Sequence, residues 1–342
     1  MPKSVPLSDA MGEYRQHMLA RNLSANTVKN NLQPIGKGLA LWGDILCSSV
    51  SPRHIDRLFQ HEDWSPSTRN LYLGQVRLFF AWCRRHGYVP KDYDPTDGWR
   101  NVRVPKVERM RIPVEDFPSL LDSASHPRDR MVCALGVYTF MRGSEIQTLR
   151  IRDYDKSKHT LHIYRHKTRE EDTLPVCEEL AREFDVWLRW YAQDRNSVLN
   201  PDWYLVPAKG PNPTIYDPFT RRLVQVPGVS GVKPECVITH PYRAVQRTMA
   251  ALGYSVMGEG EHTLRRSGAR ALFDELRTQG YDGALMRVSS MLGHRDTRVT
   301  ERYIGLGLER TQRNEMLAGK PMFPSRAEGV VIQFRSANGE RD

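Results

Sequence analysis

A break in helical periodicity between Val89 and Pro113 constrains the architecture of this chain more than any other feature. The break contains four prolines and one glycine, a composition that interrupts both helices and central strands. The 342 residues on the two sides suffice for two domains that each bury a core. The predicted segments are a first domain, a basic extended linker, a second domain and a tail, over residues 1–90, 91–112, 113–320 and 321–342.

The first domain has the pattern of a compact bundle of about four helices. One apolar stripe is spaced by four, three and four residues, at Leu7, Met11, Tyr14 and Met18. Ser24 is a typical N-cap for a second helix. The pairs Ser51-Pro52 and Ser65-Pro66 each place proline at the first position of a further helix. No catalytic group stands out in this bundle.

The second domain combines helices with a small β-sheet, so the predicted fold class is mainly α with a small sheet (α+β). A long buried helix is expected over 129–148, with Arg142 and Glu145 one turn apart on the same face. Residues 159–167 alternate as a strand and 169–176 return as its partner, which places Lys167 near the turn of a hairpin. Other elements are expected as helices at 114–124, 178–193, 240–252, 262–280, 287–292 and 297–305 and as strands at 203–206 and 330–334.

The charge balance favours a polyanionic partner. Lys and Arg total 50 against 40 Asp and Glu, which gives a net charge of +10. Many basic proteins do not bind nucleic acid, so the charge alone identifies no partner. The linker would suit a protein that closes around a duplex, and its candidate DNA contacts are Arg100, Arg103, Lys106, Arg109 and Arg111.

Cysteine and histidine usage predicts neither disulfides nor a metal site. The five cysteines are odd in number, far apart and never in a CxxC pair, which favours reduced thiols in a cytoplasm. Three histidines near the hairpin do not share one strand face and lack a completing ligand: His159, His162 and His166. No signal peptide or membrane span is expected, since no run reaches about 18 apolar residues.

A tyrosine near the end of the second domain lies in a setting that suits attack on a phosphodiester. Tyr303 follows His294 of a Leu-Gly-His triplet by nine residues, and an earlier HTLRR segment holds His262 and Arg265. Breaking a DNA backbone without metal requires deprotonation of the nucleophile, donors for the phosphorane charge, and a proton for the leaving oxygen. Ionising a tyrosine at pH 7 costs about 4 kcal/mol. Fixed donors contribute roughly 3 to 4 kcal/mol each, so several are needed.

Each element of this set is common by itself. An Arg-x-x-Glu pair is usually a helix ion pair, a hairpin lysine is usually solvated, and His-x-x-Arg often arises by chance. Their joint order is much rarer. It resembles the tyrosine recombinase family of phage integrases and Xer recombinases, whose signature matches here at Arg142, Lys167, His262, Arg265, His294 and Tyr303. The resemblance covers about residues 111–320, and the helical bundle with its linker resembles the family's SAM-like core-binding domain.

The resemblance implies a mechanism. Tyr303 would attack the scissile phosphate, giving a 3′-phosphotyrosyl link and a free 5′ hydroxyl. Lys167 would protonate the 5′ oxygen, His262 would assist proton movement at the tyrosine, and Glu145 would orient an arginine. The non-bridging oxygens would be held by Arg142, Arg265 and His294. The family needs neither metal nor ATP, so no cofactor is expected.

The resemblance also implies partners. The expected substrate is double-stranded DNA with inverted-repeat core sites, bound by a homotetramer on two duplexes. Free in solution the protein would be a monomer or weak oligomer, with no membrane association and with a directionality factor as an accessory partner. It would act at the nucleoid of a bacterial cell or phage-infected host. The segment Lys320–Asp342 is expected to dock on a neighbouring protomer.

Two roles follow in order of preference within the family, and two alternatives lie outside it. The first is integration and excision for a phage or other mobile element, and the second is Xer-type resolution of chromosome or plasmid dimers. A DNA-binding regulator that does not cleave belongs to another class, and a type IB topoisomerase shares the chemistry. The chain departs from the family at TFMRGSE, where a Gly-Leu-Arg-like run is usual, and in the long segment 194–238, which suggests no function. Because a helix is expected to begin near Leu7, we expect no arm-binding domain and no regulation by arm sites.

Overall fold

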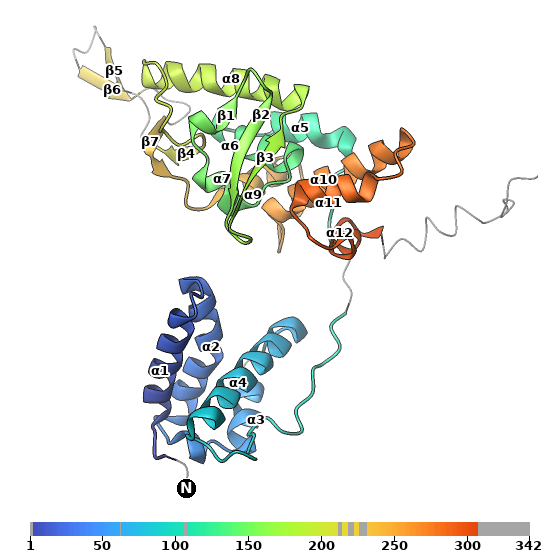
Figure 1. The fold of residues 1–342 in the computed structure, drawn as a ribbon. Helices are drawn as coiled ribbons and strands as arrows, with labels where there is room; N and C mark the ends of the chain where they lie inside the picture. The colour runs from blue at the N-terminus through green and yellow to red at the C-terminus, as the bar shows by residue number, and fades with distance from the viewer. Residues whose placement is uncertain are drawn as a thin grey trace, which may run out of the picture. The chain divides into compact units, whose positions relative to one another are not determined.

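The computed structural model describes residues 3–61, 63–105, 109–210, 214–217, 222–225 and 231–306. The chain divides into two compact units, Met1–Val107 and Glu108–Asp342 (Figure 1). Each unit has its own buried apolar cluster. The division falls inside the stretch 91–112 that the sequence analysis assigns to a linker.

The first unit is the expected helical bundle. Its helices are α1 (Leu7–Ala20), α2 (Ala25–Trp42), the short 3-10 turn η1 (Cys47–Ser49), α3 (Pro52–His61) and α4 (Pro66–His86). Ser24 and Ser65 cap α2 and α4, because their hydroxyl oxygens accept the amide hydrogens of Thr27 (3.1 Å) and Thr68 (3.3 Å). Helix α4 ends at Gly87, whose φ of +76° few other residues adopt.

The first part of the predicted linker packs on this bundle. The Tyr93 hydroxyl donates to the Val50 carbonyl (2.9 Å), and Trp99 Nε1 donates to Asp56 Oδ1 (3.1 Å). Prolines and glycine remove the helical periodicity of this stretch, but its aromatic side chains still gain from burial. This part therefore belongs to the first unit and not to an extended linker between the domains.

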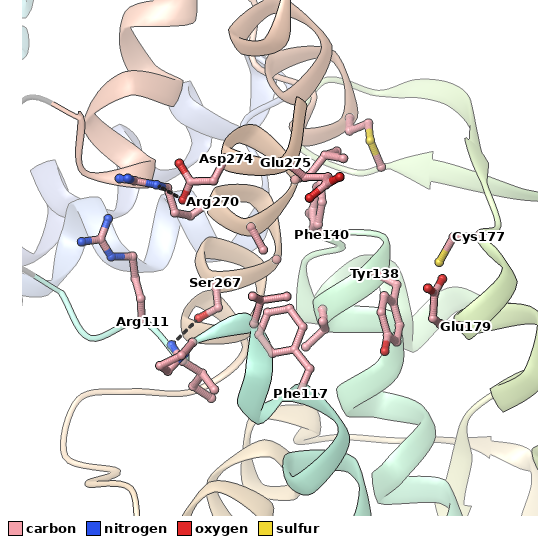
Figure 2. A pocket seen from close by; sticks show the side chains of 18 of the residues that line it. Arg111, Phe117, Tyr138, Phe140, Cys177, Glu179, Ser267, Arg270, Asp274 and Glu275 are labelled. Carbon is pink, nitrogen blue, oxygen red and sulfur yellow. Dashed lines mark hydrogen bonds and ion pairs between the residues drawn. The ribbon is translucent and has the colours of Figure 1, made fainter. Parts of the chain in front are cut away.

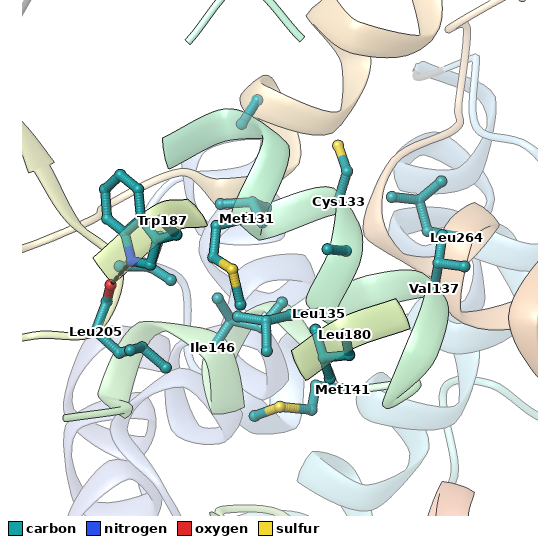
Figure 3. Packing of buried hydrophobic residues seen from close by; sticks show 14 of the residues in the cluster. Met131, Cys133, Leu135, Val137, Met141, Ile146, Leu180, Trp187, Leu205 and Leu264 are labelled. Atoms are coloured by element: carbon teal, nitrogen blue, oxygen red, sulfur yellow. Dashed lines mark hydrogen bonds between the residues drawn. The ribbon is translucent and has the colours of Figure 1, made fainter. Parts of the chain in front are cut away.

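The second unit is built around a buried central helix. Its helical elements are η2 (Val114–Asp116), α5 (Phe117–Asp122), α6 (Pro127–Tyr138), α7 (Gly143–Thr148), η3 (Ile151–Asp153), α8 (Glu178–Arg195), α9 (Pro241–Ala251), α10 (Glu261–Thr278), α11 (Ala284–Leu292) and α12 (Thr297–Ile304). Helix α6 contacts α5, α7, α8, α9 and α10. Figure 3 shows the α6 side chains Met131 and Val137 packed among residues of these helices, including Leu264 of α10.

Three small antiparallel sheets complete this unit. Their strands are β1 (Tyr154–Asp155), β2 (Thr160–Arg165), β3 (Glu170–Pro175), β4 (Pro207–Lys209), β5 (Thr214–Asp217), β6 (Arg222–Gln225) and β7 (Val232–Val237), paired as β1-β2-β3, β4-β7 and β5-β6. Arg165 pairs with Glu170, so the turn between β2 and β3 contains Lys167 as expected. In Figure 1 this hairpin projects away from α8. The strand expected at 203–206 is only a bridge at Tyr204, and β4 begins at Pro207.

The single helix predicted over 129–148 is in fact two helices. Helix α6 ends at Tyr138, Phe140 adopts a φ of +56°, and α7 begins at Gly143. The prediction is wrong because Phe140 and Met141 are both buried, so the apolar run continues through the break without a sign of it. Arg142 is consequently the N-cap of α7 and not a residue on a helix face.

None of the helices in the described part of the chain is long and apolar enough to cross a membrane. The tail 321–342, with the strand expected at 330–334, lies outside the described residues.

Candidate active site

Arg142 and Glu145 form the first part of the site. The Arg142 amide donates to Glu145 Oε2 (2.7 Å), and Arg142 Nη1 donates to Glu145 Oε1 (2.8 Å). The glutamate side chain is 1% exposed and the arginine side chain 20% exposed. The buried carboxylate therefore fixes a guanidinium that still reaches the surface, as a positioned anion binder requires.

Arg265 is a buried cation on α10. Its Nη1 donates to the Phe140 carbonyl at the break after α6, and its Nη2 donates to the Leu292 carbonyl (2.6 Å) at the end of α11. Burial, assisted by the charge of Arg142, lowers the pKa of Arg265 to about 10, so it stays charged at pH 7. One turn further, Gly268 allows close approach of α10 to α6, because a Cβ there would clash with the Val137 carbonyl.

Tyr303 of α12 lies against His262 at the start of α10. The Tyr303 hydroxyl donates to the His262 carbonyl (3.2 Å) and lies 3.4 Å from His262 Nδ1. Arg265 Cζ is 5.9 Å from the centre of the tyrosine ring. Burial raises the pKa of Tyr303, although nearby arginines, with Arg265 first, oppose this shift. Burial and the charge of Arg265 lower the pKa of His262, so this imidazole is neutral at pH 7.

His294 follows Gly293, whose φ of +64° ends α11. Its Nδ1 lies 3.0 Å from Thr300 Oγ1, which in turn donates to Ser289 Oγ (3.0 Å). Since the threonine hydroxyl has one hydrogen, it must accept from Nδ1–H, which leaves Nε2 without a hydrogen in the neutral ring. Burial and the charges of Arg265 and Arg142 lower the pKa of His294 to about 4. The ring centre lies 5.7 Å from that of Tyr303.

Lys167 is exposed in the turn of the β2–β3 hairpin. In the described part of the chain its ammonium has no hydrogen-bond partner. After burial and the charges of Arg265 and Arg142, the charge of Lys167 also helps to lower the pKa of His294. The structure thus brings five of the six signature residues into one cluster and places the sixth on the adjoining hairpin.

A family model, that of the phage integrase family, matches residues 111–307. The match spans more than half of the 342 residues and includes all six signature positions. The chain belongs to this family. It is a tyrosine recombinase, as the sequence resemblance predicts, and the family carries out site-specific recombination. Among curated protein sequences no relative matches.

Solved structures share the fold of this recombinase. A lambda integrase dimer bound to a COC′ core site is 16% identical with a TM-score of 0.64, over 88% of this chain and 78% of that chain. The Tn1549 transposon integrase in complex with a circular intermediate DNA is 15% identical with a TM-score of 0.60, over 92% and 99%. The XerH recombinase bound to difH is 16% identical with a TM-score of 0.57, over 88% and 82%. These likenesses confirm the predicted α+β fold.

The residues that are predicted to contact DNA have different surroundings in the structure. Arg109 lines a cavity of about 490 Å³ together with His262 and Tyr303. Arg111 Nη1 donates to the Ile304 carbonyl (2.7 Å) at the end of α12. Arg100 and Arg103 are exposed in the first unit, and Lys106 lies outside the described residues.

Two features of the site escape the sequence analysis. Arg165 at the end of β2 is buried, and alternation along this strand could have revealed it, because it shares the inward face with Leu161 and Ile163. Ser289 and Thr300, which fix His294, carry no recognisable signal in the sequence.

The histidines near the hairpin form hydrogen bonds with neighbouring side chains. His162 bonds Thr173 and His166 bonds Thr148, at 3.1 Å each.

A second, larger cavity of the recombinase has an apolar lining. It has a volume of about 880 Å³, and residues of α5, of the end of α6 and of the middle of α10 line it. Figure 2 shows Phe117, Tyr138 and Phe140 within it, with Arg111 and Arg270 at one end. Neither Tyr303 nor His262 lines this cavity, so it is separate from the candidate active site.

Proposed function

We propose that this recombinase cuts and rejoins DNA at specific sites through a 3′-phosphotyrosyl intermediate, as the integrase of a phage or other mobile element. The observation that carries the proposal is the Tyr303 hydroxyl, 3.4 Å from His262 Nδ1 and beside the buried cation Arg265. A phenol held between a neutral base and fixed cations is suited to nucleophilic attack on a phosphodiester.

The chemical step assigns a task to each group. The Tyr303 oxygen bonds to phosphorus while its proton passes toward His262, whose low pKa keeps it able to accept. Arg142 and Arg265 compensate the charge that develops on the non-bridging oxygens. The bond between phosphorus and the 5′ oxygen breaks, and that oxygen takes a proton from Lys167. Glu145 keeps the Arg142 guanidinium in place.

His294 gains a role only when phosphate is bound. In the free protein its Nε2 lacks a hydrogen, because Nδ1–H is given to Thr300. A phosphate beside the ring adds negative charge, which raises the pKa of His294 from about 4 and favours the imidazolium. The protonated ring then donates from Nε2 to a non-bridging oxygen.

We further infer that the reaction needs neither ATP nor metal. The phosphotyrosyl ester replaces one phosphodiester by another of similar kind, so its energy is retained for rejoining. A 5′ hydroxyl from a partner duplex attacks this ester and releases Tyr303. The residues that would carry both steps are the site residues already described.

The proposed substrate is double-stranded DNA with inverted-repeat core sites, bound by a homotetramer. Supporting structures include the lambda integrase dimer on its core site and a lambda integrase tetramer bound to a Holliday junction. The net charge of +10 suits this partner, and phosphate contacts make affinity fall steeply with salt. Arg100, Arg103 and Arg109 are the described candidates for such contacts. Free in solution the protein would be a monomer or weak oligomer at the nucleoid, and a directionality factor would set the balance of integration and excision.

Assembly would use the C-terminal segment Lys320–Asp342, docked on a neighbouring protomer. The apolar cavity in Figure 2 is a suitable receptor for its apolar run VVIQF. Arg111 and Arg270 at the cavity both donate to the Ile304 carbonyl, so the end of α12 lies beside it. Deleting the segment should abolish cooperative assembly on paired sites in a gel-shift titration. Unchanged cooperativity would contradict this docking.

Two other roles remain as alternatives. Xer-type resolution of chromosome or plasmid dimers uses the same chemistry and would show as cutting at a chromosomal or plasmid repeat. A regulator that does not cleave would need no nucleophile, and the placement of Tyr303 beside His262 favours cleavage.

Covalent trapping tests the proposal. The full chain and its Tyr303→Phe variant are incubated with sheared genomic DNA of the host and denatured in detergent, and protein-linked DNA is sequenced. We expect adducts only with the unchanged chain, converging on one short inverted repeat. Tight binding without any adduct would instead support the regulator.

A further inference from the structure

Arg165 both closes and anchors the hairpin turn that carries Lys167. It is the last residue of β2 and is 3% exposed. Its backbone carbonyl accepts the amide hydrogens of Thr168 (3.2 Å) and Arg169 (2.7 Å), which form the turn. The backbone position of Arg165 therefore sets the position of the turn.

The Arg165 guanidinium connects the hairpin to two other elements of the site. Its Nε and Nη2 both lie 2.6 Å from Asp172 Oδ2 on β3. Nη2 also donates to the Met291 carbonyl on α11 (2.8 Å), and Nη1 lies 3.9 Å from Glu145 Oε1 on α7. These elements lead to His294 and Arg142, respectively. One buried cation thus fixes three segments relative to one another.

The fit around this guanidinium is close. A Cβ on Gly293 would lie 2.7 Å from Arg165 Nη1, so the arginine packs directly on the backbone that leads into His294. A lysine at the same position would present a single ammonium and lose the planar set of donors that reaches Asp172 and Met291 together. Arg165→Lys therefore keeps the charge and removes the connection.

We propose that Arg165 is a positioning residue for proton transfer to the leaving 5′ oxygen, because it holds the turn from which Lys167 reaches that oxygen. The inference rests on the proposed phosphotyrosyl mechanism. Lys167 is exposed and has no side-chain partner in the described residues, so only its backbone position directs it. A displacement of about 1 Å costs up to about 100-fold in rate at a reacting centre.

The Tyr303 oxygen bonds to phosphorus, the bond from phosphorus to the 5′ oxygen breaks, and a proton moves from Lys167 Nζ to that oxygen. If sulfur replaces the 5′ bridging oxygen, the leaving group is a thiolate. Because a thiol is far more acidic than an alcohol, the thiolate leaves without that proton.

The experiment compares two duplexes that carry the DNA site identified by covalent trapping. One is natural, and the other has sulfur at the 5′ bridging position of the scissile phosphate. For Arg165→Lys we expect covalent adduct formation about 10- to 100-fold slower than wild type on the natural duplex. On the sulfur duplex the slowing should be much smaller, because the proton from Lys167 is not needed there. Lys167→Ala should show the same pattern. Arg128→Lys, at another buried arginine paired with a carboxylate, is the matched control and should match wild type on both.

Three results would overturn the inference. Equal slowing on both duplexes would mean that Arg165 does not act through proton transfer, and an unchanged rate on the natural duplex would mean that it positions nothing. If Arg165→Lys does not fold, Asp172→Asn is the second variant. It keeps the arginine and weakens the contact that the Asp172 carboxylate makes with it. That variant should show a smaller loss confined to the natural duplex, and a loss on both would again overturn the proposal. Absence of adduct with the wild type itself would instead reject the proposed function.

Discussion

The two units of this recombinase bury different kinds of residue. In the first unit the buried side chains are almost all apolar, with Gln75 and Thr96 as the polar examples among the described residues. In the second unit several charged groups are buried around the site, including Glu145, Arg165 and Arg265. A buried charge costs free energy unless it is paired and hydrogen-bonded. The core of the bundle is therefore held by apolar packing, whereas the second unit must surround its buried charges with ion pairs and hydrogen bonds.

The largest effect on stability is expected in the apolar bundle. Phe80→Ala removes a fully buried ring from α4 and should lower the unfolding free energy of the first unit by about 3–5 kcal/mol. Calorimetry of the full chain would measure the shift of that unit's transition. Leu78→Ala, on the same helix but 58% exposed, is the control and should change little. An equal shift of the second unit's transition would contradict the separation of the two cores.

In the second unit, replacing a fully buried residue should reduce the rate of DNA cleavage before it reduces stability. Arg265→Met removes a buried cation and should slow adduct formation about 10²- to 10³-fold, because a fixed donor to the developing charge is lost. Single-turnover cleavage of the trapped site would measure this. Arg128→Met is the control, since Arg128 is also buried but bonds Asp129 outside the site. Full cleavage by Arg265→Met would remove this residue from the mechanism.

The polar site should also make the second unit sensitive to acid. The pKa of His294 is lowered from 6.5 to about 4 in the folded chain, so between these values the unfolded chain binds more protons. Stability should therefore fall as the pH drops from about 6.5 to 4, by about 1–3 kcal/mol from this residue. Urea unfolding of wild type and His294→Gln at pH 7 and pH 5 would compare the two slopes.

His294→Gln should lose less stability than wild type over this pH interval. The control is His162→Gln, at an exposed histidine of the same unit. If both variants keep the full wild-type slope, the buried imidazole is not the source of the acid sensitivity.

The smallest effect is expected at a helix end of the bundle. Ser24→Ala removes the side-chain acceptor for the Thr27 amide and should cost about 1 kcal/mol. Ser24→Asn retains an acceptor and should restore most of this loss. Thermal unfolding of the first unit would measure both. A loss as large as that of Phe80→Ala would mean that polar contacts matter as much in the bundle as they do in the second unit.

Much of the fold could be predicted from local pattern. The bundle helices follow from apolar spacing with serine caps, and the hairpin follows from alternation on both sides of a polar turn. The six signature residues could be named because their order is rare. These features depend on residues that are close in the sequence, so local patterns are enough to predict them.

The rest depends on contacts between distant residues. The break at Phe140 lies within an apolar run and is stabilised by Arg265, which is far away in the chain. Strand β1 has only two residues, too few for a pattern. The role of Ser289 and Thr300 arises only when α11 and α12 bring them to His294.

The bend between α6 and α7 serves as a spacer between two cations. The Phe140 carbonyl in this bend accepts a hydrogen bond from Arg265, and the bend ends two residues later at Arg142. An insertion or deletion of one residue there would change the separation of the two guanidinium groups without altering either side chain. The loop should therefore tolerate exchange of side chains more readily than any change of length.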